Sequence, residues 1–455
     1  MSILAASIAM AIPRGTPAAG PAVLQPGETL TVARAVALAL AYHPARQAAE
    51  ASADAARERI GEARAGLLPH VFGVAEYLRG TDNGIGDTAY LPAPGAPRAP
   101  TTGRHVNQLT ETFDNYLGAL SAYQYLFDFG RTRGLVAQRS AEADAARARL
   151  QVVRLDLVYE VTKAFYDLVA AREIVRVFEQ AVAQRTEHLH EAEVKARAGL
   201  RPDIDTFTAG AELARSKLRL TDARNAAATA KVALDNAMGL GPGAPDYRQP
   251  DDLPRGIVTG TLDGYLGRAL QQRPDLQLLE DEARAAGAEI REYRSDYWPT
   301  VGAVAGVNTR GQDATPGTNF EGGVVVTWPL FDGYRTDHEV AEARLRQESV
   351  RHSIDELRQR IALQVQRSFL DWQASVERIR RAEQTVAASQ VELELAAKRY
   401  ETGLGSIIEL TDAQRRFSED GAQEVGAVAG FSIAKAALDR DTGVGIPAPE
   451  PAPSG

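Results

Sequence analysis

Residues 135–198 decide the fold, because LVAQRSAEADAARARLQVVRLDLVYEVTKAFYDLVAAREIVRVFEQAVAQRTEHLHEAEVKARA contains neither glycine nor proline. The interval between Gly333 and Gly403 shares this property. Glycine and proline are the strongest helix breakers, so we expect two long helices over 132–197 and 335–401. At ~1.5 Å per residue, a helix of about 65 residues is ~100 Å long.

Apolar residues recur at spacings of three and four along both expected helices, which is typical of coiled coils. A helix this long cannot bury itself in a globule and must lie along other helices. The stripe residues are Leu150, Val153, Leu157, Val161, Phe165 and Leu168 in one helix, and Ile354, Leu357, Ile361, Val365, Phe369 and Trp372 in the other.

The chain also repeats itself, and four pairs of short motifs indicate an internal two-fold duplication. The offset between copies is 230 at the first two pairs (274 − 44, 299 − 69) and 204 at the last two (332 − 128, 403 − 199), so the first copy contains a longer loop by 230 − 204 = 26 residues. The pairs are His43-Pro44 with Arg273-Pro274, Leu68-Pro69 with Trp298-Pro299, Leu126-Phe127-Asp128 with Leu330-Phe331-Asp332, and Ala198-Gly199-Leu200 with Thr402-Gly403-Leu404.

The duplication predicts two repeats, each with a helix, a β-hairpin, a long helix and a return helix. The first repeat spans 28–261, with a first helix over 45–66, a hairpin over 69–127, a long helix over 132–197, a return helix over 203–238 and a linker over 239–261. The second spans 262–443, with a first helix over 275–296, a hairpin over 299–331, a long helix over 335–401 and a return helix over 407–441. Residues 444–455 are Pro-rich and are expected to be disordered.

The N-terminal segment 1–27 contains an apolar stretch of signal-peptide length, from Ser2 to Ile12, but lacks a positively charged start. We interpret it as a remnant of a signal peptide, with a flexible or buried apolar arm as the alternative.

Strand character falls at 69–79, 113–127, 299–308 and 318–331, and the last segment alternates from Phe320 to Leu330. Each segment has the ~10 residues that a tilted strand needs to cross a bilayer. Four strands cannot close a barrel, and open edges are not tolerated in lipid, so a membrane interpretation requires two chains (8 strands) or three (12 strands). The alternative is a pair of soluble hairpins that cap a helical bundle.

Composition excludes several function classes. The chain has no cysteine, so disulfides, thiolate metal sites and a cysteine-linked lipid anchor are excluded. Its net charge of −9 disfavours nucleic-acid binding. It contains no Walker loop, nucleophile elbow or H-E-x-x-H motif. We therefore expect no enzyme activity, no cofactor and no metal site.

Together these motifs resemble the TolC-type outer-membrane factor family, also called outer-membrane efflux proteins. The resemblance covers about residues 28–443. The motifs that carry it are His43-Pro44 and Arg273-Pro274, Ala63-Arg-Ala-Gly-Leu-Leu-Pro69, Leu126-Phe-Asp-Phe-Gly130, Trp328-Pro-Leu-Phe-Asp-Gly333 and Tyr400-Glu-Thr-Gly-Leu404.

The resemblance implies a mainly α fold with membrane β structure. A homotrimer would share one twelve-stranded barrel in the outer membrane of a Gram-negative cell, with its long helices forming a coiled-coil barrel in the periplasm. The implied partners are outer-membrane lipid, a periplasmic adaptor (membrane fusion) protein, and an inner-membrane pump or ABC transporter. Tyr123, Tyr125, Phe127, Trp298, Trp328 and Phe331 are the expected aromatic girdle at the membrane interface.

By the same resemblance, the turns between long and return helices form a periplasmic gate. Tyr400 matches a bridging tyrosine, Glu409 and Asp412 match two acidic rings, and Asp205, with Asp203 beside it, matches an acidic position in the first copy. Three copies of these acids would favour cations in a narrow mouth. The alternative for Glu409 and Asp412 is that they are ordinary acids at a helix N-terminus, favoured by the helix dipole.

Gly405 departs from the family pattern, because the family's best-known form has an arginine there that pairs with the tip tyrosine and acid. Arg201, in the first turn, is the candidate to replace it. The turns also contain the expected adaptor contacts Arg197, Gly199, Leu200, Gly403 and Leu404, although glycine after a basic last turn is also a common helix end.

The sequence thus predicts a passive exit duct for small molecules in a tripartite efflux system. Two alternatives remain: the exit duct of a type I protein secretion system, and a soluble coiled-coil scaffold without a barrel.

Overall fold

A computed structural model describes residues 24–81, 112–241, 243–249, 253, 256–312 and 317–445. The expectations for the apolar leader up to residue 23, for most of the first-copy loop and for the tail from residue 446 lie outside these residues.

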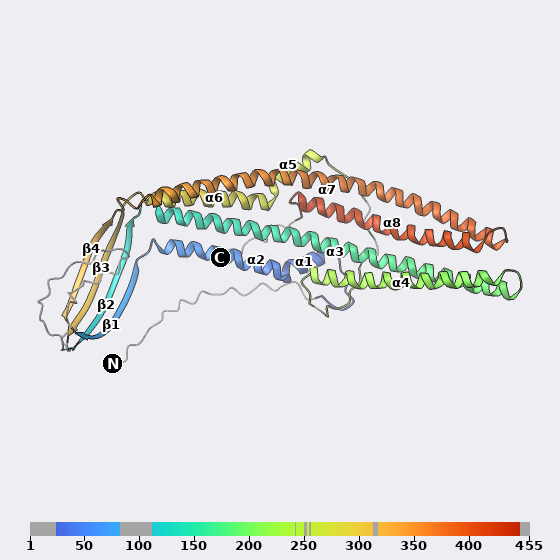
Figure 1. The fold of residues 1–455 in the computed structure, drawn as a ribbon, viewed down its shortest axis with the longest axis horizontal. Helices are drawn as coiled ribbons and strands as arrows, with labels where there is room; N and C mark the ends of the chain where they lie inside the picture. The colour runs from blue at the N-terminus through green and yellow to red at the C-terminus, as the bar shows by residue number, and fades with distance from the viewer. Residues whose placement is uncertain are drawn as a thin grey trace. The chain divides into compact units, whose positions relative to one another are not determined.

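The described chain is mainly helical, with four strands, and its second half repeats the element series of the first (Figure 1). Corresponding helices have equal lengths of 11, 22, 67 and 35 residues. The elements are α1 (Val32–Tyr42), α2 (Pro44–Ala65), β1 (His70–Thr81), β2 (Thr112–Phe127), α3 (Arg131–Arg197), α4 (Asp203–Ala237), α5 (Leu262–Gln272), α6 (Pro274–Ser295), β3 (Thr300–Gln312), β4 (Gly317–Thr327), α7 (Arg335–Glu401) and α8 (Ile407–Asp441).

The chain divides into two compact units, and the helices α3 and α7 contribute to both. The sheet unit comprises Ala48–Val152 and Arg273–Arg360, and includes all four strands. The turn unit comprises Met1–Gln47, Val153–Gln272 and Ile361–Gly455, and includes the turns that follow α3 and α7.

The four strands form one antiparallel sheet in the order β1-β2-β3-β4. Paired residues on neighbouring antiparallel strands point to the same face, so the register defines two faces. One face is apolar and exposed, and Phe320 on it is 83% exposed. Its large residues are Val71, Tyr77, Tyr116, Leu120, Val301, Val307, Phe320, Val324 and Val326.

The opposite face is mixed, because Phe72, Val74, Leu117, Val304 and Val325 lie on it beside polar residues and glycines. It includes Glu76, Ser121, Asn308, Asn319 and Glu321, together with several glycines. Asn319 Nδ2 donates to Asn308 Oδ1 across the strands at 3.3 Å. The sheet therefore has one largely apolar face, and the other face carries the polar side chains Glu76, Asn308, Asn319 and Glu321 among apolar residues.

β4 is shorter than the sequence analysis predicts. It ends at Thr327, so Trp328 and Leu330 do not continue the alternating face that begins at Phe320. Proline has no backbone N–H to donate to a ladder, and Pro329 follows at once. The periodicity of apolar residues extends further than the pairing does.

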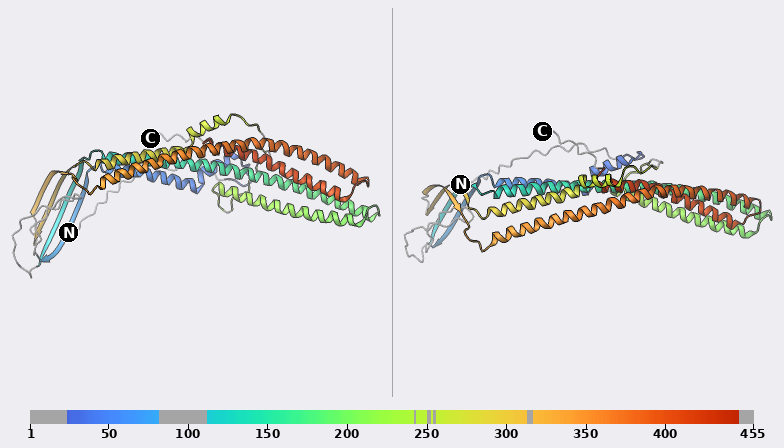
Figure 2. Two further views of the ribbon diagram at one scale, coloured as in Figure 1. Left: turned by 45° about the horizontal axis from the view of Figure 1, so that its top comes forward. Right: turned by 90° about the horizontal axis from the view of Figure 1, so that it is seen from above.

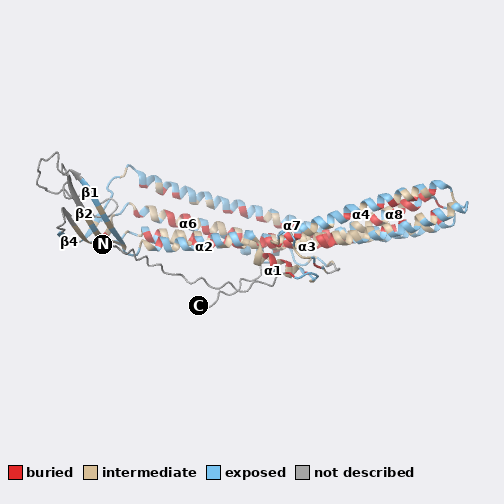
Figure 3. Cartoon of the chain, turned by 90° about the horizontal axis from the view of Figure 1, so that it is seen from below, coloured by how far each residue is buried: buried red, intermediate tan, exposed pale blue. Residues whose placement is uncertain are grey.

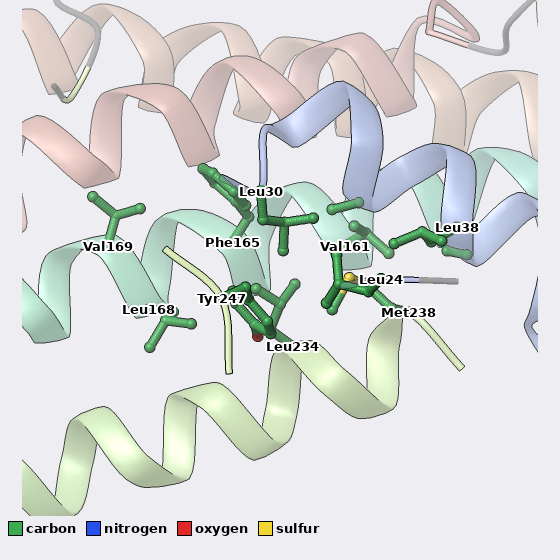
Figure 4. Packing of buried hydrophobic residues seen from close by; sticks show 12 residues of the cluster. Leu24, Leu30, Leu38, Val161, Phe165, Leu168, Val169, Leu234, Met238 and Tyr247 are labelled. Atoms are coloured by element: carbon green, nitrogen blue, oxygen red, sulfur yellow. The ribbon is translucent and has the colours of Figure 1, made fainter. Parts of the chain in front are cut away.

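The turn unit contains the main apolar core, shown in Figure 4. α1 and the segment that precedes it pack against the middle of α3 and the end of α4. The core residues include Leu24, Leu30, Leu38, Val161, Phe165, Leu168, Leu234, Met238 and Tyr247. The hydroxyl of Tyr247 donates to Asp235 at 2.9 Å, which satisfies a buried polar pair.

Along the long helices, buried and exposed residues alternate in the manner expected for coiled-coil packing (Figure 3). Eleven of the twelve predicted stripe residues are buried, and Val153 is partly buried. In the turn unit, α3 lies beside α4 and α7 beside α8 in both views of Figure 2. The ion pairs Arg224–Glu179 at 2.7 Å and Arg416–Glu392 at 2.6 Å join these helix pairs.

Small residues let the helices of the sheet unit approach closely. Gly134 on α3 faces the backbone of Glu292 on α6, so that a Cβ at this position would lie 2.9 Å from the Glu292 nitrogen. Arg346 of α7 pairs with Glu289 of α6 at 2.7 Å. Among the described residues, no helix combines the length and the apolar character that crossing a membrane requires.

Replacing Gly134 by alanine should destabilise the protein by roughly 1–3 kcal/mol, because the added methyl group meets backbone atoms that cannot move aside. The matched control is Gly61→Ala on α2, where a Cβ has nothing within 4 Å. That change should stabilise the helix by up to about 1 kcal/mol. Urea unfolding followed by circular dichroism measures both, and equal effects would contradict the close contact.

Candidate functional site

The turns that follow α3 and α7 have the same hydrogen-bonded geometry. Gly199 and Gly403 adopt φ values of 69° and 78°, a region that favours glycine. The amide of Leu200 donates to the Lys195 carbonyl at 2.9 Å, and the amide of Leu404 donates to the Arg399 carbonyl at 2.9 Å. These are Schellman motifs, which terminate each long helix and direct the chain into the return helix.

The second turn is tighter than the first at Gly405. Its amide also donates to the Arg399 carbonyl, at 2.8 Å. A Cβ at residue 405 would lie 3.0 Å from backbone atoms of Arg399 and Tyr400. A side chain at residue 405, such as the arginine of the family's best-known form, would therefore need the backbone of this turn to shift by a few tenths of an ångström.

Tyr400 links the two helix pairs. Its side chain is only 3% exposed, and its hydroxyl donates to Asp205 Oδ2 on α4 at 3.3 Å. Asp205 is itself 7% exposed. The contact joins the last turn of α7 to the first turn of α4, across 195 residues of sequence.

Arg201 completes this contact, as a residue of the first turn. Its guanidinium carbon lies 4.5 Å from the centroid of the Tyr400 ring, and Nη2 donates to the Tyr400 carbonyl oxygen. A cation over an aromatic face is attracted to its negative quadrupole. We call Arg201, Asp205 and Tyr400 the turn cluster.

The electrostatics of the turn cluster keep the tyrosine protonated. Burial, followed by the negative charge of Asp205, raises the pKa of Tyr400 above its ordinary value, and the charge of Arg201 acts in the opposite direction. The hydroxyl is therefore a neutral donor at physiological pH. Lys195 Nζ also lies 5.5 Å from the ring centroid and pairs with Glu191 at 2.5 Å.

Glu409 and Asp412 lie in the first two turns of α8, and each has a basic partner. Glu409 Oε1 is 3.0 Å from Arg399 Nε, and Asp412 Oδ1 is 3.5 Å from Arg415 Nη2. The Glu409 amide donates to the Ser406 hydroxyl at 3.2 Å, so Ser406 caps the helix. Both carboxylates are nearly half exposed, so solvent and ligands can reach them.

The remaining turn residues are on the surface. Asp203 is exposed in the first turn of α4, apart from the turn cluster. Leu200 and Leu404 are strongly exposed at equivalent positions of the two turns. Arg197 donates to the Glu193 carbonyl at 3.3 Å at the end of α3.

The residues of the expected aromatic girdle lie in different parts of the sheet unit. Tyr123 pairs in register with Val304, which places it on the mixed face that also carries Glu321, packed against Tyr125 with ring centroids 4.8 Å apart. Phe127 pairs with Val301 and lies on the apolar face, beyond a β-bulge. Trp298, Trp328 and Phe331 lie outside the strands, in the segments that precede β3 and follow β4.

Sequence reasoning missed two sets of contacts. Lys195 lies beside the Tyr400 ring and Arg399 pairs with Glu409, and the basic last turns of α3 and α7 were the available signal. Phe129 belongs to the motif Leu126-Phe-Asp-Phe-Gly130, but its ring contact was not predicted. It has a φ of 51° and stacks on Trp298 with ring centroids 5.4 Å apart. Only the folded chain brings these two rings together.

Comparison with known proteins places this arrangement in a family. The family model described as outer membrane efflux protein matches residues 35–240 and 265–444. The chain belongs to the outer membrane efflux protein family, whose members are outer-membrane channel and transport proteins.

Two curated relatives and one solved structure illustrate the likeness. Protein CyaE of Bordetella pertussis is 26% identical over 396 residues, which cover 85% of this chain and 78% of CyaE. The alkaline protease secretion protein AprF of Pseudomonas aeruginosa is 24% identical, over 83% of this chain and 77% of AprF. The crystal structure of CusC matches with a TM-score of 0.76 at 17% identity, over 91% of this chain and 92% of CusC, and so shows the shared fold.

Gly405→Ala should open the second turn at a cost of roughly 1–3 kcal/mol, because the methyl group would meet the backbone of Arg399 and Tyr400. Hydrogen exchange at the amides of residues 402–405 should accelerate accordingly. Gly210→Ala is the control, since its Cβ would meet only Leu189, at 4.0 Å. Unchanged protection in Gly405→Ala would disprove the steric argument.

Proposed function

We propose that this protein is a passive exit duct of the outer membrane, assembled as a homotrimer, through which small molecules leave the periplasm. The sheet carries the proposal: one face is largely apolar and exposed, and the carboxylates Glu76 and Glu321 lie on the opposite face, with glycines and apolar residues around them. Such a sheet suits a barrel wall with hydrocarbon outside and water inside. The outer membrane efflux family supports the same function.

The edges of the sheet support the trimer. β1 and β4 pair on one side only within the chain, so each leaves a row of backbone N–H and C=O groups without partners in the sheet. In lipid these groups must be paired, and pairing β1 of one copy with β4 of the next satisfies both edges. Three copies of four strands make twelve.

The soluble coiled-coil scaffold fits the sheet less well. It would leave the whole apolar face in water, including Phe320, Val324 and Val326, which are each more than half exposed in the single chain. Exposed apolar patches of this kind mark surfaces that face lipid or a partner.

The turn cluster is proposed to be the gate of the duct. Tyr400 and Asp205 hold the α7–α8 pair against the α3–α4 pair, and Arg201 stabilises this arrangement through the ring and carbonyl of Tyr400. We propose that Arg201 takes the role of the arginine that Gly405 replaces. Separation of the helix pairs would then widen the mouth.

In this proposal, partner proteins supply the energy for transport and recognise the substrate. Exposed Leu200 and Leu404, together with Arg197, Gly199 and Gly403, form the proposed contact surface for a periplasmic adaptor protein. An inner-membrane pump or an ABC transporter would deliver the substrate. In this arrangement the helical part of the chain lies in the periplasm.

A second candidate function, protein secretion, has one specific observation in its favour. AprF, which is named as an alkaline protease secretion protein, aligns with most of this chain. A duct that passes unfolded protein uses the same wall and gate, so the distinction lies in the partners rather than in the residues described above.

Planar-bilayer recording tests the duct and its gate together. The purified protein should form stable pores, and Asp205→Ala should raise their open probability, because the buried Tyr400 hydroxyl then loses its acceptor at a cost of roughly 1–3 kcal/mol. Asp222→Ala is the matched control, since it removes an exposed carboxylate from the same helix. A protein that never conducts would refute the duct, whereas equal opening in both variants would refute only the gate.

The acids at the start of α8 give a separate expectation. Mg²⁺ added on the side of the turns should block the current, because three copies of Glu409 and Asp412 focus negative potential at the mouth. Replacing these residues by Gln and Asn should reduce the block severalfold. The control pair Glu187→Gln and Asp222→Asn removes the same charge from exposed positions on α3 and α4. If the two pairs of substitutions weaken the block equally, the acids are ordinary surface residues.

A further inference from the structure

Two adjoining hollows lie where the sheet meets the helices, both within the sheet unit. The first has a volume of about 380 Å³ and is lined by Phe129, Gly130, Arg133, Gly134, Arg291, Arg294, Ser295 and Trp298. The second, of about 330 Å³, is lined by Leu67, Tyr125, Leu126, Phe127, Asp128, Phe129, Gly130 and Arg133. They adjoin at Phe129, Gly130 and Arg133, and we call the two together the groove. Arg291 and Arg294 lie at its basic end, and Leu67, Leu126 and Phe127 lie at its more apolar end.

Aromatic rings connect the groove to the apolar face of the sheet. Phe127 lies on that face, in register with Val301 and Val326. Its ring centroid is 4.7 Å from that of Phe129, which in turn stacks on Trp298 at 5.4 Å with the ring planes 11° apart. A hydrocarbon chain lying on the sheet can therefore continue over exposed rings to the basic end.

The basic end has unbalanced positive charge. Arg133, Arg291 and Arg294 are exposed, and no carboxylate lines this hollow. Within the described residues, Arg133 and Arg294 have no ion pair, and Arg291 donates only to the Gly287 carbonyl, at 3.2 Å. Asp128, in the neighbouring hollow, accepts from the amides of Gly130 and Thr132 at 3.1 and 2.7 Å, and so is engaged in the turn.

We propose that this groove binds an anionic phospholipid, with the phosphate between Arg133, Arg291 and Arg294 and an acyl chain along Phe129 and Phe127. Guanidinium groups bind phosphate oxygens in a fork geometry, and aromatic side chains are favoured at the boundary between headgroups and hydrocarbon. A free phosphate ion would match the arginines but would leave the apolar end exposed to water. The proposal rests on the proposed function, because it requires the sheet to lie in a bilayer.

Quenching of Trp298 fluorescence by brominated lipids tests the proposal. The reporter background is Trp328→Phe with Trp372→Phe, and the buried Trp372 Nε1 has no hydrogen-bond partner to lose. The full chain is reconstituted in two matched vesicle sets of phosphatidylcholine with a minority of phosphatidylglycerol. Bromine is carried by the acyl chains of one lipid or of the other, and quenching is compared per brominated molecule.

Phosphatidylglycerol should quench Trp298 at least about fivefold more effectively than phosphatidylcholine, which corresponds to the preference that one basic residue provides near an anionic surface. Replacing Arg133, Arg291 and Arg294 together by Gln should bring the ratio to unity. The control variant replaces Arg57, Arg59 and Arg351 by Gln, and so removes the same charge from exposed helical positions that line neither hollow; it should retain the preference.

Conductance of the same vesicles separates the two proposals. Vesicles that conduct but show equal quenching by both lipids would overturn lipid binding and leave the duct intact. If the lipid preference is lost both in the variant of Arg133, Arg291 and Arg294 and in the control variant, the preference arises from general surface charge. That result would also overturn the site. Inorganic phosphate that abolishes the preference would assign the arginines to a free ion instead. Vesicles that neither conduct nor quench would overturn both proposals.

Discussion

A helix of 67 residues cannot bury its apolar stripe against itself, and the rest of the structure depends on this constraint. Each long helix needs partners along its whole length. α4 and α8 supply them in the turn unit, while α6, rich in alanine, packs against the first parts of α3 and α7 in the sheet unit. Close approach there relies on positions such as Gly134, where an added methyl group would contact the backbone of Glu292.

The turns join each long helix to its return helix. Both end in the same Schellman geometry, yet they are not equivalent, because a Cβ at Gly405 in the second turn would crowd the backbone of Arg399 and Tyr400. The positive charge that the cluster uses comes instead from Arg201 in the first turn. One link between the helix pairs is thus a buried phenol, a buried carboxylate and a guanidinium, drawn from both halves of the chain.

Much of the fold could be predicted from local patterns. The absence of glycine and proline located the long helices to within a residue or two of α3 and α7, and the spacing of apolar residues identified the faces that are buried. The last strand was overextended to Phe331, because alternation continues past Thr327 while Pro329 cannot take part in a ladder. Tyr400 and Asp205 were proposed by resemblance, whereas the ring contacts of Lys195 and Phe129 join segments that are far apart in the sequence.

The sequence by itself determined the elements, their order and their repetition, since helix breakers and apolar periodicity act over a few residues at a time. Only the tertiary structure decided which groups meet. It placed Arg201 on Tyr400 across 199 residues, brought Phe129 onto Trp298 beside three arginines, and separated Tyr123 from Phe127 onto opposite faces of the sheet. Such contacts depend on strand register and helix packing, which arise from the sum of many weak interactions and cannot be read from any one segment.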